Sequence, residues 1–270
     1  MSNQNGSNGS APAELARVLT LRSLVFYGIA FIIPLAFFTT YGIVTNTTHG
    51  HVSMTYVVAT LCMVFTAYSY CRMSKAFPSS GSVYAYATET FNPYIGFIAG
   101  WTIVLGYMFL PMLNYLASAI FMQAALPSIP LWVWVVLFTV IVTGANLLGI
   151  RVADIFNNVV VIIQLIFLVV LLIMTVRYIT GHDLALNMSA FYNSEEFANM
   201  GGVKGIASGA AIVCLAYLGF DGIAALGEEA IEPKKNIPKA LMICCIGVGA
   251  MYVIFTYLLQ AAWPTAWNEI

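Results

Sequence analysis

The chain has 270 residues, of which 61% are apolar and only 8% are charged, and its formal net charge is −1. A soluble domain carries roughly a quarter charged residues, so the composition excludes an ordinary globular protein and predicts an all-α protein of a lipid bilayer. The net charge by itself says nothing about charged partners, and we expect no nucleic acid among the partners. Five cysteines lie in or beside apolar stretches without metal-ligand spacing, so we expect neither a metal nor a cofactor.

The first dozen residues are polar and rich in glycine and serine, without the basic start and apolar core of a signal peptide. We expect residues 1–18 to form a disordered cytoplasmic tail. Apolar segments long enough to cross a bilayer as helices, about 20 residues each, then follow in order. They run from Ser23 to Val44, Val52 to Tyr70, Pro93 to Ala124, Leu131 to Gly149, Ile155 to Tyr178, Gly205 to Leu226, and Lys239 to Trp263.

Two stretches between these seven predicted spans have a character of their own. The sequence "GSVYAYATETFNP", which leads into the third span, is typical of a short amphipathic helix at the membrane interface. Residues 181–204 form the one long connection, which we expect to be an external loop carrying few basic residues. "THGH", between the first two spans, places two histidines in an outer loop, where we expect them to be solvated.

Lysine and arginine set the orientation, because cytoplasmic loops carry their excess. With the N-terminus inside, only Arg177 and Lys204 of the ten basic residues fall outside. The chain is therefore expected in the cell membrane with a cytoplasmic N-terminus. The basic residues on the predicted inner side are Arg17, Arg22, Arg72, Lys75, Arg151, Lys234, Lys235 and Lys239.

Spans one and six carry residues that interrupt a helix. The first contains Gly28 and Pro34, and a proline removes a backbone donor and clashes with the preceding turn. The sixth contains Asp221 between Gly219 and Gly222. Interrupted spans at corresponding positions of two halves indicate the substrate site of a secondary transporter, here in a five-plus-five inverted repeat.

A structural explanation competes with this one, because single glycines and prolines are common in membrane helices and often serve packing alone. Asp221 favours the functional interpretation, since an ionisable residue inside a membrane is a functional candidate by default. Two breaks together with one acid therefore predict a site that binds a polar solute.

Three stretches resemble the amino acid–polyamine–organocation permeases: "GFDGIAALGEEAIEPKKNIPKAL", "FPSSGSVYAYATETFNPYIGFIAGW" and "NLLGIRVADIFN". Within that family the chain is most similar to the putrescine importers, through "HGHVSMTY", "YMFLPMLNYL" and "GAAIVCLAYLGFD". The resemblance implies an inverted-repeat fold, with residues 19–180 as the first repeat and 205–270 as the start of the second. Since such permeases have about twelve spans, it also implies a chain truncated after the seventh span, inactive by itself and able to oligomerise.

The resemblance implies substrate binding at the unwound parts of spans one and six, and coupling to an ion, the proton being favoured. Pro34 has no N–H to offer a substrate carboxylate, which favours a polyamine such as putrescine over an amino acid, the alternative within the family. Gln164 stands where proton-coupled relatives have lysine, so Asp221 is the candidate proton carrier. The candidate binding residues are Ala30, Phe31, Ile33, Pro34, Leu35, Ala36, Tyr107, Ala216, Tyr217, Gly219, Phe220 and Asp221.

After the sixth span, Glu228 and Glu229 are expected to face Lys234 and Lys235 in a loop tethered by ion pairs, as part of an inner gate. A solvated loop that only fixes the topology is the alternative. A seven-span receptor and a fragment that does not transport remain rival functions. The inward N-terminus argues against the receptor, and the absence of a Ser/His/Asp set or an HExxH motif argues against an enzyme.

Overall fold

The computed structural model describes residues 17–32, 34–148, 150–182 and 188–263. Within these ranges the regular structure is helical, apart from an isolated bridge between Leu19 and Ala230. The elements are α1 (Leu21–Ile32), α2 (Ala36–Thr47), α3 (Val52–Ala76), α4 (Ser82–Thr90), α5 (Pro93–Ala125), α6 (Leu131–Leu147), α7 (Ile150–Gly181), η1 (Met188–Ala190), α8 (Ser194–Asn199), α9 (Val203–Val213), η2 (Cys214–Tyr217), α10 (Gly222–Ala225) and α11 (Pro233–Ala262).

Each of the seven predicted spans contains a helix, although not every helix is long enough to cross a membrane by itself. In the described part of the chain α3, α5, α7, the combination of α9 to α10, and α11 are long and apolar enough to cross a membrane. The pair α1 and α2, bent by 45°, is long and apolar enough for a sixth when the two helices count as one broken span. The shorter, mostly apolar α6 has 17 residues, about 26 Å of helix at 1.5 Å per residue. The all-α membrane fold is confirmed, with spans one and six both discontinuous.

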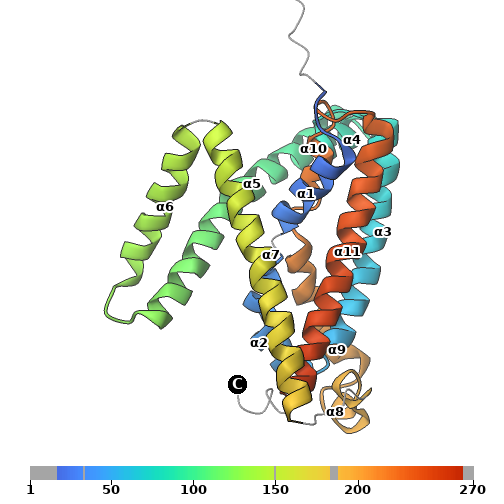
Figure 1. Ribbon diagram of the computed structural model, residues 1–270. Coiled ribbons are helices and arrows are strands. Elements are labelled where there is room, and N and C mark those ends of the chain that lie inside the picture. The colour runs from blue at the N-terminus through green and yellow to red at the C-terminus, as the bar shows by residue number, and fades with distance from the viewer. Residues whose placement is uncertain (1–16, 33, 149, 183–187, 264–270) are drawn as a thin grey trace, which may run out of the picture.

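The core lies where α3 and α11 pack side by side along their lengths, and α1, α2, α9 and α10 lie against this pair (Figure 1). Helix α11 is apolar on most of its surface, yet one face is buried at helical spacing. That face carries Ile237, Leu241, Cys244, Cys245, Val248, Tyr252, Phe255 and Leu259. The two interrupted spans run antiparallel, because α1 contacts α10 and α2 contacts α9.

Helices α5 and α6 form a hairpin that extends away from this core (Figure 1). The start of α5 is fixed locally: the Asn92 side chain accepts a hydrogen bond from the Ile95 amide at 2.9 Å, and Pro93 occupies the first turn. The predicted interfacial helix is α4, which packs on α5. It connects the end of α3 to the start of α5 and forms one wall of the pocket described below.

Candidate functional site

The break in the first span lies where the sequence predicts it. Helix α1 ends at Ile32, α2 begins at Ala36, and Pro34 and Leu35 form a turn between them. The last carbonyls of a helix have no partner within it. At membrane depth such groups need a partner from the protein or a wet cavity. Ile33 lies outside the described residues.

The break in the sixth span begins after Val213, where the helix tightens into η2 and then leaves helical geometry. A continuous helix would direct the Phe220 amide to Ala216, but this amide donates to the Tyr217 carbonyl at 3.4 Å. Gly219 has a φ of +101°, a conformation that side chains other than glycine rarely adopt. The carbonyl of Ala216 is therefore left free of the helix ladder.

The two breaks face each other directly. A Cβ atom built on Gly219 would collide with the carbonyl group of Phe31, and one on Gly222 would lie 2.9 Å from the Phe31 ring. One turn earlier in α1, a Cβ on Gly28 would collide with Ile223 of α10 and lie 2.6 Å from the Cys244 sulfur. The glycines that weaken both helices thus allow their backbones to touch.

One buried side chain from a third helix joins the two breaks. The hydroxyl of Tyr252, in α11, donates to the Ala216 carbonyl at 3.1 Å and lies 3.5 Å from the Ile32 carbonyl. Its ring packs edge-on against Tyr217 and lies tilted against Tyr56, with ring centroids 5.3 Å apart. A phenol has a single proton to donate, and of these two carbonyls that of Ala216 is the closer. Sequence reasoning missed Tyr252, although a tyrosine in an apolar span is itself a signal.

The hydroxyl of Tyr217 is also partnered, at 2.5 Å, by the side chain of Thr60 in α3. The Tyr56 hydroxyl lies 3.4 Å from Thr40 of α2. Together with the Tyr252 bond, these contacts connect spans one, two, six and seven around the breaks. They also show that Tyr217, a predicted binding residue, is fully buried by the protein itself.

Asp221 sits at the break, directly before α10, and is half-buried. It lies near the tyrosines Tyr70 of α3 and Tyr107 of α5. Phe220 is 5% exposed and packs edge-on against Tyr70, with ring centroids 5.3 Å apart. The structure thus brings Tyr107 toward Asp221 and leaves the Phe220 ring covered.

The other predicted binding residues differ in how far the protein covers them. Phe31 is 39% exposed and Tyr107 is 51% exposed, so both can present a ring face to a ligand. The remaining ones are small or covered: Pro34, Ala216 and Tyr217 are buried, and Ala30, Leu35, Ala36 and Gly219 are half-buried.

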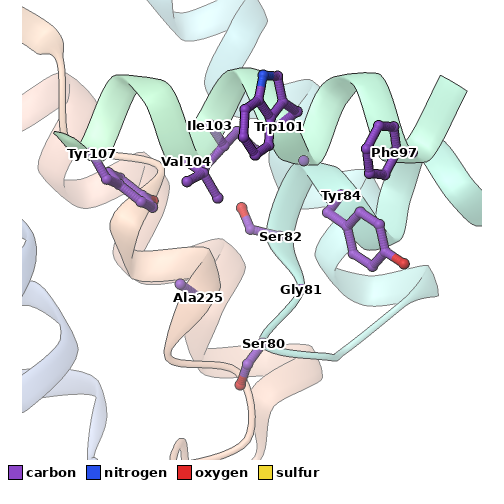
Figure 2. Close-up of a pocket in the computed structure, with 11 residues that line it drawn as sticks. Ser80, Gly81, Ser82, Tyr84, Phe97, Trp101, Ile103, Val104, Tyr107 and Ala225 are labelled. Atoms are coloured by element: carbon purple, nitrogen blue, oxygen red, sulfur yellow. The ribbon is translucent and has the colours of Figure 1, made fainter. Parts of the chain in front are cut away.

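A pocket of about 380 Å³ adjoins the break between α4, α5 and α10 (Figure 2). Of the predicted site residues, Tyr107 forms part of its wall. The buried Ser82 hydroxyl points toward Val104 in Figure 2 and has no hydrogen-bond partner in the described part of the protein. Sequence reasoning did not single out this pocket, whose aromatic lining comes from Tyr84, Phe97, Trp101 and Tyr107.

The loop after the sixth span is tethered differently from the expected pattern. Glu228 accepts a hydrogen bond from the Ser80 amide at 3.3 Å, and its own amide donates to the Ser80 hydroxyl at 3.3 Å. The Glu229 carbonyl accepts from the Leu19 amide at 2.9 Å. Among the described residues, the ion pair of this loop joins Lys235 to Glu232 at 3.1 Å instead of to either predicted glutamate. Backbone and serine contacts therefore hold the loop.

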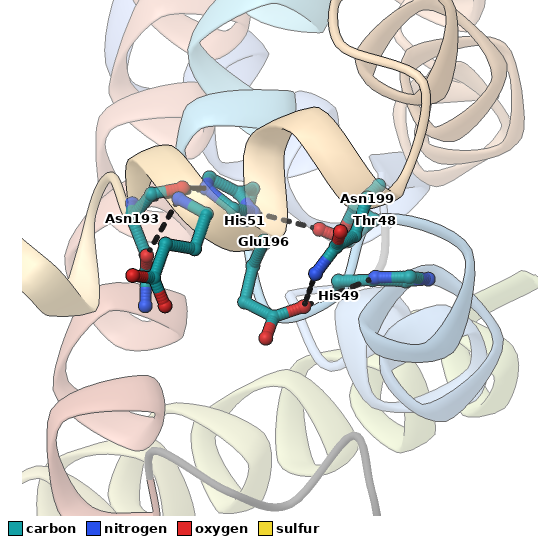
Figure 3. Close-up of polar contacts among 7 residues, drawn as sticks. Thr48, His49, His51, Asn193, Glu196 and Asn199 are labelled. Atoms are coloured by element: carbon teal, nitrogen blue, oxygen red, sulfur yellow. Dashed lines mark hydrogen bonds and ion pairs between the residues drawn. The ribbon is translucent and has the colours of Figure 1, made fainter.

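A second polar cluster lies at the opposite end, between the α2–α3 corner and α8 (Figure 3). His51 is 2% exposed, which corrects the expectation of a solvated loop residue. Its Nδ1 lies 2.8 Å from the Thr48 carbonyl, and its Nε2 accepts from the Asn193 amide at 3.1 Å. His49 pairs with Glu196 at 3.3 Å. No group of three or more metal-ligating side chains occurs in the described ranges.

The fold and the site define a class before any comparison: a multi-pass helical membrane protein with two antiparallel, interrupted spans meeting at a carboxylate. A family model described as "Amino acid permease" matches residues 23–269. The chain belongs to this family, and the resemblance drawn from its motifs is confirmed. The family is one of permeases and not of enzymes, as the sequence predicts.

Individual relatives agree with this assignment. The low-affinity putrescine importer PlaP of Escherichia coli (strain K12) is 34% identical over 263 residues, covering 96% of this chain and 57% of the relative. The methylthioribose transporter of Bacillus subtilis (strain 168) is 28% identical, with 95% and 58% covered. The branched-chain amino acid permease BcaP of the same organism is 27% identical, with 95% and 57% covered. The chain therefore spans somewhat more than half the length of these relatives.

Proposed function

We propose that the chain carries the substrate site of a secondary transporter that imports a small organic amine, of which putrescine is the best candidate. The observation that carries the proposal is the meeting of the two helix breaks beside Asp221, in a chain 34% identical to a putrescine importer. An acid at such a position attracts an ammonium group, because few other charges at membrane depth compete for it.

The chemistry of the breaks favours a donor-rich cation. The carbonyls of Ile32 and Ala216, one from each break, both lie near the Tyr252 hydroxyl, so the breaks are rich in acceptors. The exposed rings of Phe31 and Tyr107 offer cation–π contacts worth about 0.5–2 kcal/mol each. Together these groups suit an alkylammonium ion.

An α-amino acid is the second candidate substrate, and the relative named as a branched-chain amino acid permease supports it. An amino acid also needs donors for its carboxylate. Pro34 removes an amide from the first break, so this site has fewer donors to give than acceptors. On this ground we rank an amine without a carboxylate first.

Proton coupling through Asp221 and a cytoplasmic N-terminus complete the proposal. A carboxylate that loses charge on protonation can release a bound cation, which would couple the movement of amine and proton. The concentration of basic residues at one end supports placing that end in the cytoplasm of a cell-membrane protein. In this proposal residues 19–180 form one repeat and residues 205–270 belong to the next.

Uptake of labelled putrescine tests the proposal in cells that lack their own putrescine importers. The chain is expressed alone and joined to the part of the E. coli importer that it does not match. We expect saturable uptake by at least one form, with unlabelled amines competing more strongly than amino acids. Stronger competition by a neutral amino acid would select the second candidate, and uptake by neither form despite normal membrane levels would reject transport.

A further inference from the structure

A cluster of basic side chains lies at one end of the contact between α3 and α11. Lys75 belongs to the last turn of α3, and Lys234, Lys235 and Lys239 belong to the first two turns of α11. All four are exposed, and they line a pocket of about 370 Å³. Because α3 and α11 run antiparallel, these termini meet at the same end of the molecule (Figure 1). The other walls of the pocket are Tyr68, Cys71, Pro238 and Met242.

The pocket carries an excess of positive charge. Lys235 is paired with Glu232 at 3.1 Å. Among the described residues, no carboxylate lies within ion-pair distance of the ammonium groups of the other three lysines. Glu228, in the preceding loop, bonds to Ser80 instead. A concave surface lined by one sign of charge concentrates ligands of the opposite sign, so the pocket suits an anion.

The same contact between α3 and α11 continues into an apolar pocket of about 290 Å³. On α3, Leu61 lies seven residues before Tyr68 of the basic pocket, and on α11 Ile246 lies four residues after Met242. These intervals are whole helical turns, so both pockets lie on the same face of each helix. The apolar pocket is lined by Val57, Thr60, Leu61, Ile246, Gly249, Ala250, Val253 and Ile254.

We propose that this α3–α11 groove, made of the basic and the apolar pocket together, binds one anionic phospholipid. The phosphate group lies among Lys75, Lys234 and Lys239, and one acyl chain follows the apolar pocket toward the middle of the membrane. The eleven residue steps from Met242 to Val253 span about 16 Å of helix. That length matches half of a hydrocarbon core about 30 Å thick, which is what one leaflet provides.

The arrangement favours a lipid over a small soluble anion. A free phosphate would use the lysines alone and leave the apolar pocket empty. Leu61 and Ile254 are more than half exposed, so the apolar pocket opens on the side of the helices that faces hydrocarbon. Basic pockets between membrane helices recognise lipid head groups by this combination of charge and apolar floor.

Native mass spectrometry of the purified chain tests the proposal, with dioleoyl phosphatidylglycerol as the anionic probe and dioleoyl phosphatidylcholine as the neutral one. We expect one retained phosphatidylglycerol and much weaker retention of phosphatidylcholine. Replacing Lys75, Lys234 and Lys239 by glutamine should weaken phosphatidylglycerol binding on the order of a hundredfold, since each basic group near a lipid surface contributes appreciably. The matched control, Arg177→Gln with Lys204→Gln at the opposite end, should stay within twofold of the parent.

A second variant tests the acyl half of the groove. Ala250→Phe fills the apolar pocket while the lysines remain, and it should reduce phosphatidylglycerol retention about tenfold. Equal retention of the two lipids, or unchanged binding by the lysine variant, would refute the proposal. Unchanged binding by Ala250→Phe, or displacement of the lipid by inorganic phosphate, would also refute it in favour of a small-anion site. If the triple variant fails to fold in phosphatidylcholine, the single change Lys239→Gln provides the same comparison.

Discussion

Replacing Gly219 with alanine should destabilise the protein more than the addition of a single methyl group suggests. The residue has a φ of +101°, and its Cα faces the Phe31 carbonyl across the two breaks. A methyl group there opposes the backbone conformation of one break and pushes against the backbone of the other. The substitution therefore perturbs the contact between the two interrupted spans at its closest point.

Two terms give the size of the effect. A left-handed conformation costs an alanine about 1–2 kcal/mol. Forcing an extra methyl group into a packed contact adds about 1–3 kcal/mol, because the Phe31 carbonyl belongs to the backbone and cannot swing aside. The sum is about 2–5 kcal/mol. At roughly 2–4 °C per kcal/mol for a chain of this size, the melting temperature should fall by about 4–20 °C.

Thermal unfolding in detergent, followed with a thiol-reactive fluorescent probe, measures this shift. Cys71, Cys244 and Cys245 are buried in the folded chain and become reactive when the core opens. The matched control is Gly247→Ala in α11, because a Cβ there meets nothing within 4 Å. That change should leave the melting temperature unchanged or slightly higher, since alanine is the better helix former. A Gly219→Ala chain that melts within about 1 °C of the parent would refute the reasoning.

Three further changes test other parts of the structure. Tyr252→Phe removes the hydroxyl shared by the two breaks, so the free energy that protects residues 214–222 from amide hydrogen exchange should fall by about 1–3 kcal/mol. The control Tyr56→Phe should leave exchange in that segment unchanged. Asp221→Asn should abolish putrescine uptake while membrane levels stay normal. The control Glu89→Gln, which changes an exposed carboxylate of α4, should leave uptake intact. Uptake by the Asp221→Asn variant within twofold of the parent would contradict the role of Asp221. His51→Ala should speed limited proteolysis of residues 188–199, because α8 loses its anchor, and an unchanged cleavage rate would show that the anchor is dispensable.

The sequence by itself determined the class of the protein and the positions of its irregularities. Composition and the length of the apolar segments are enough to predict spans, because a bilayer leaves the backbone few choices besides a helix of fixed length. Pro34 and Gly219 mark the breaks through covalent properties, a missing donor and a missing Cβ, which act in any surroundings. Asp221 could be identified as a candidate for a similar reason, since a carboxylate is costly at membrane depth whatever surrounds it.

Tertiary structure alone decided what these residues meet. Helices that are apolar on most faces show little periodicity, so the sequence does not tell which face of α11 turns inward or that Tyr252 reaches both breaks. Phe220 is covered by Tyr70, and His51 is buried against Asn193, because helices distant in the sequence happen to lie beside them. Such contacts depend on how helices pack against each other, which local propensity and composition do not encode.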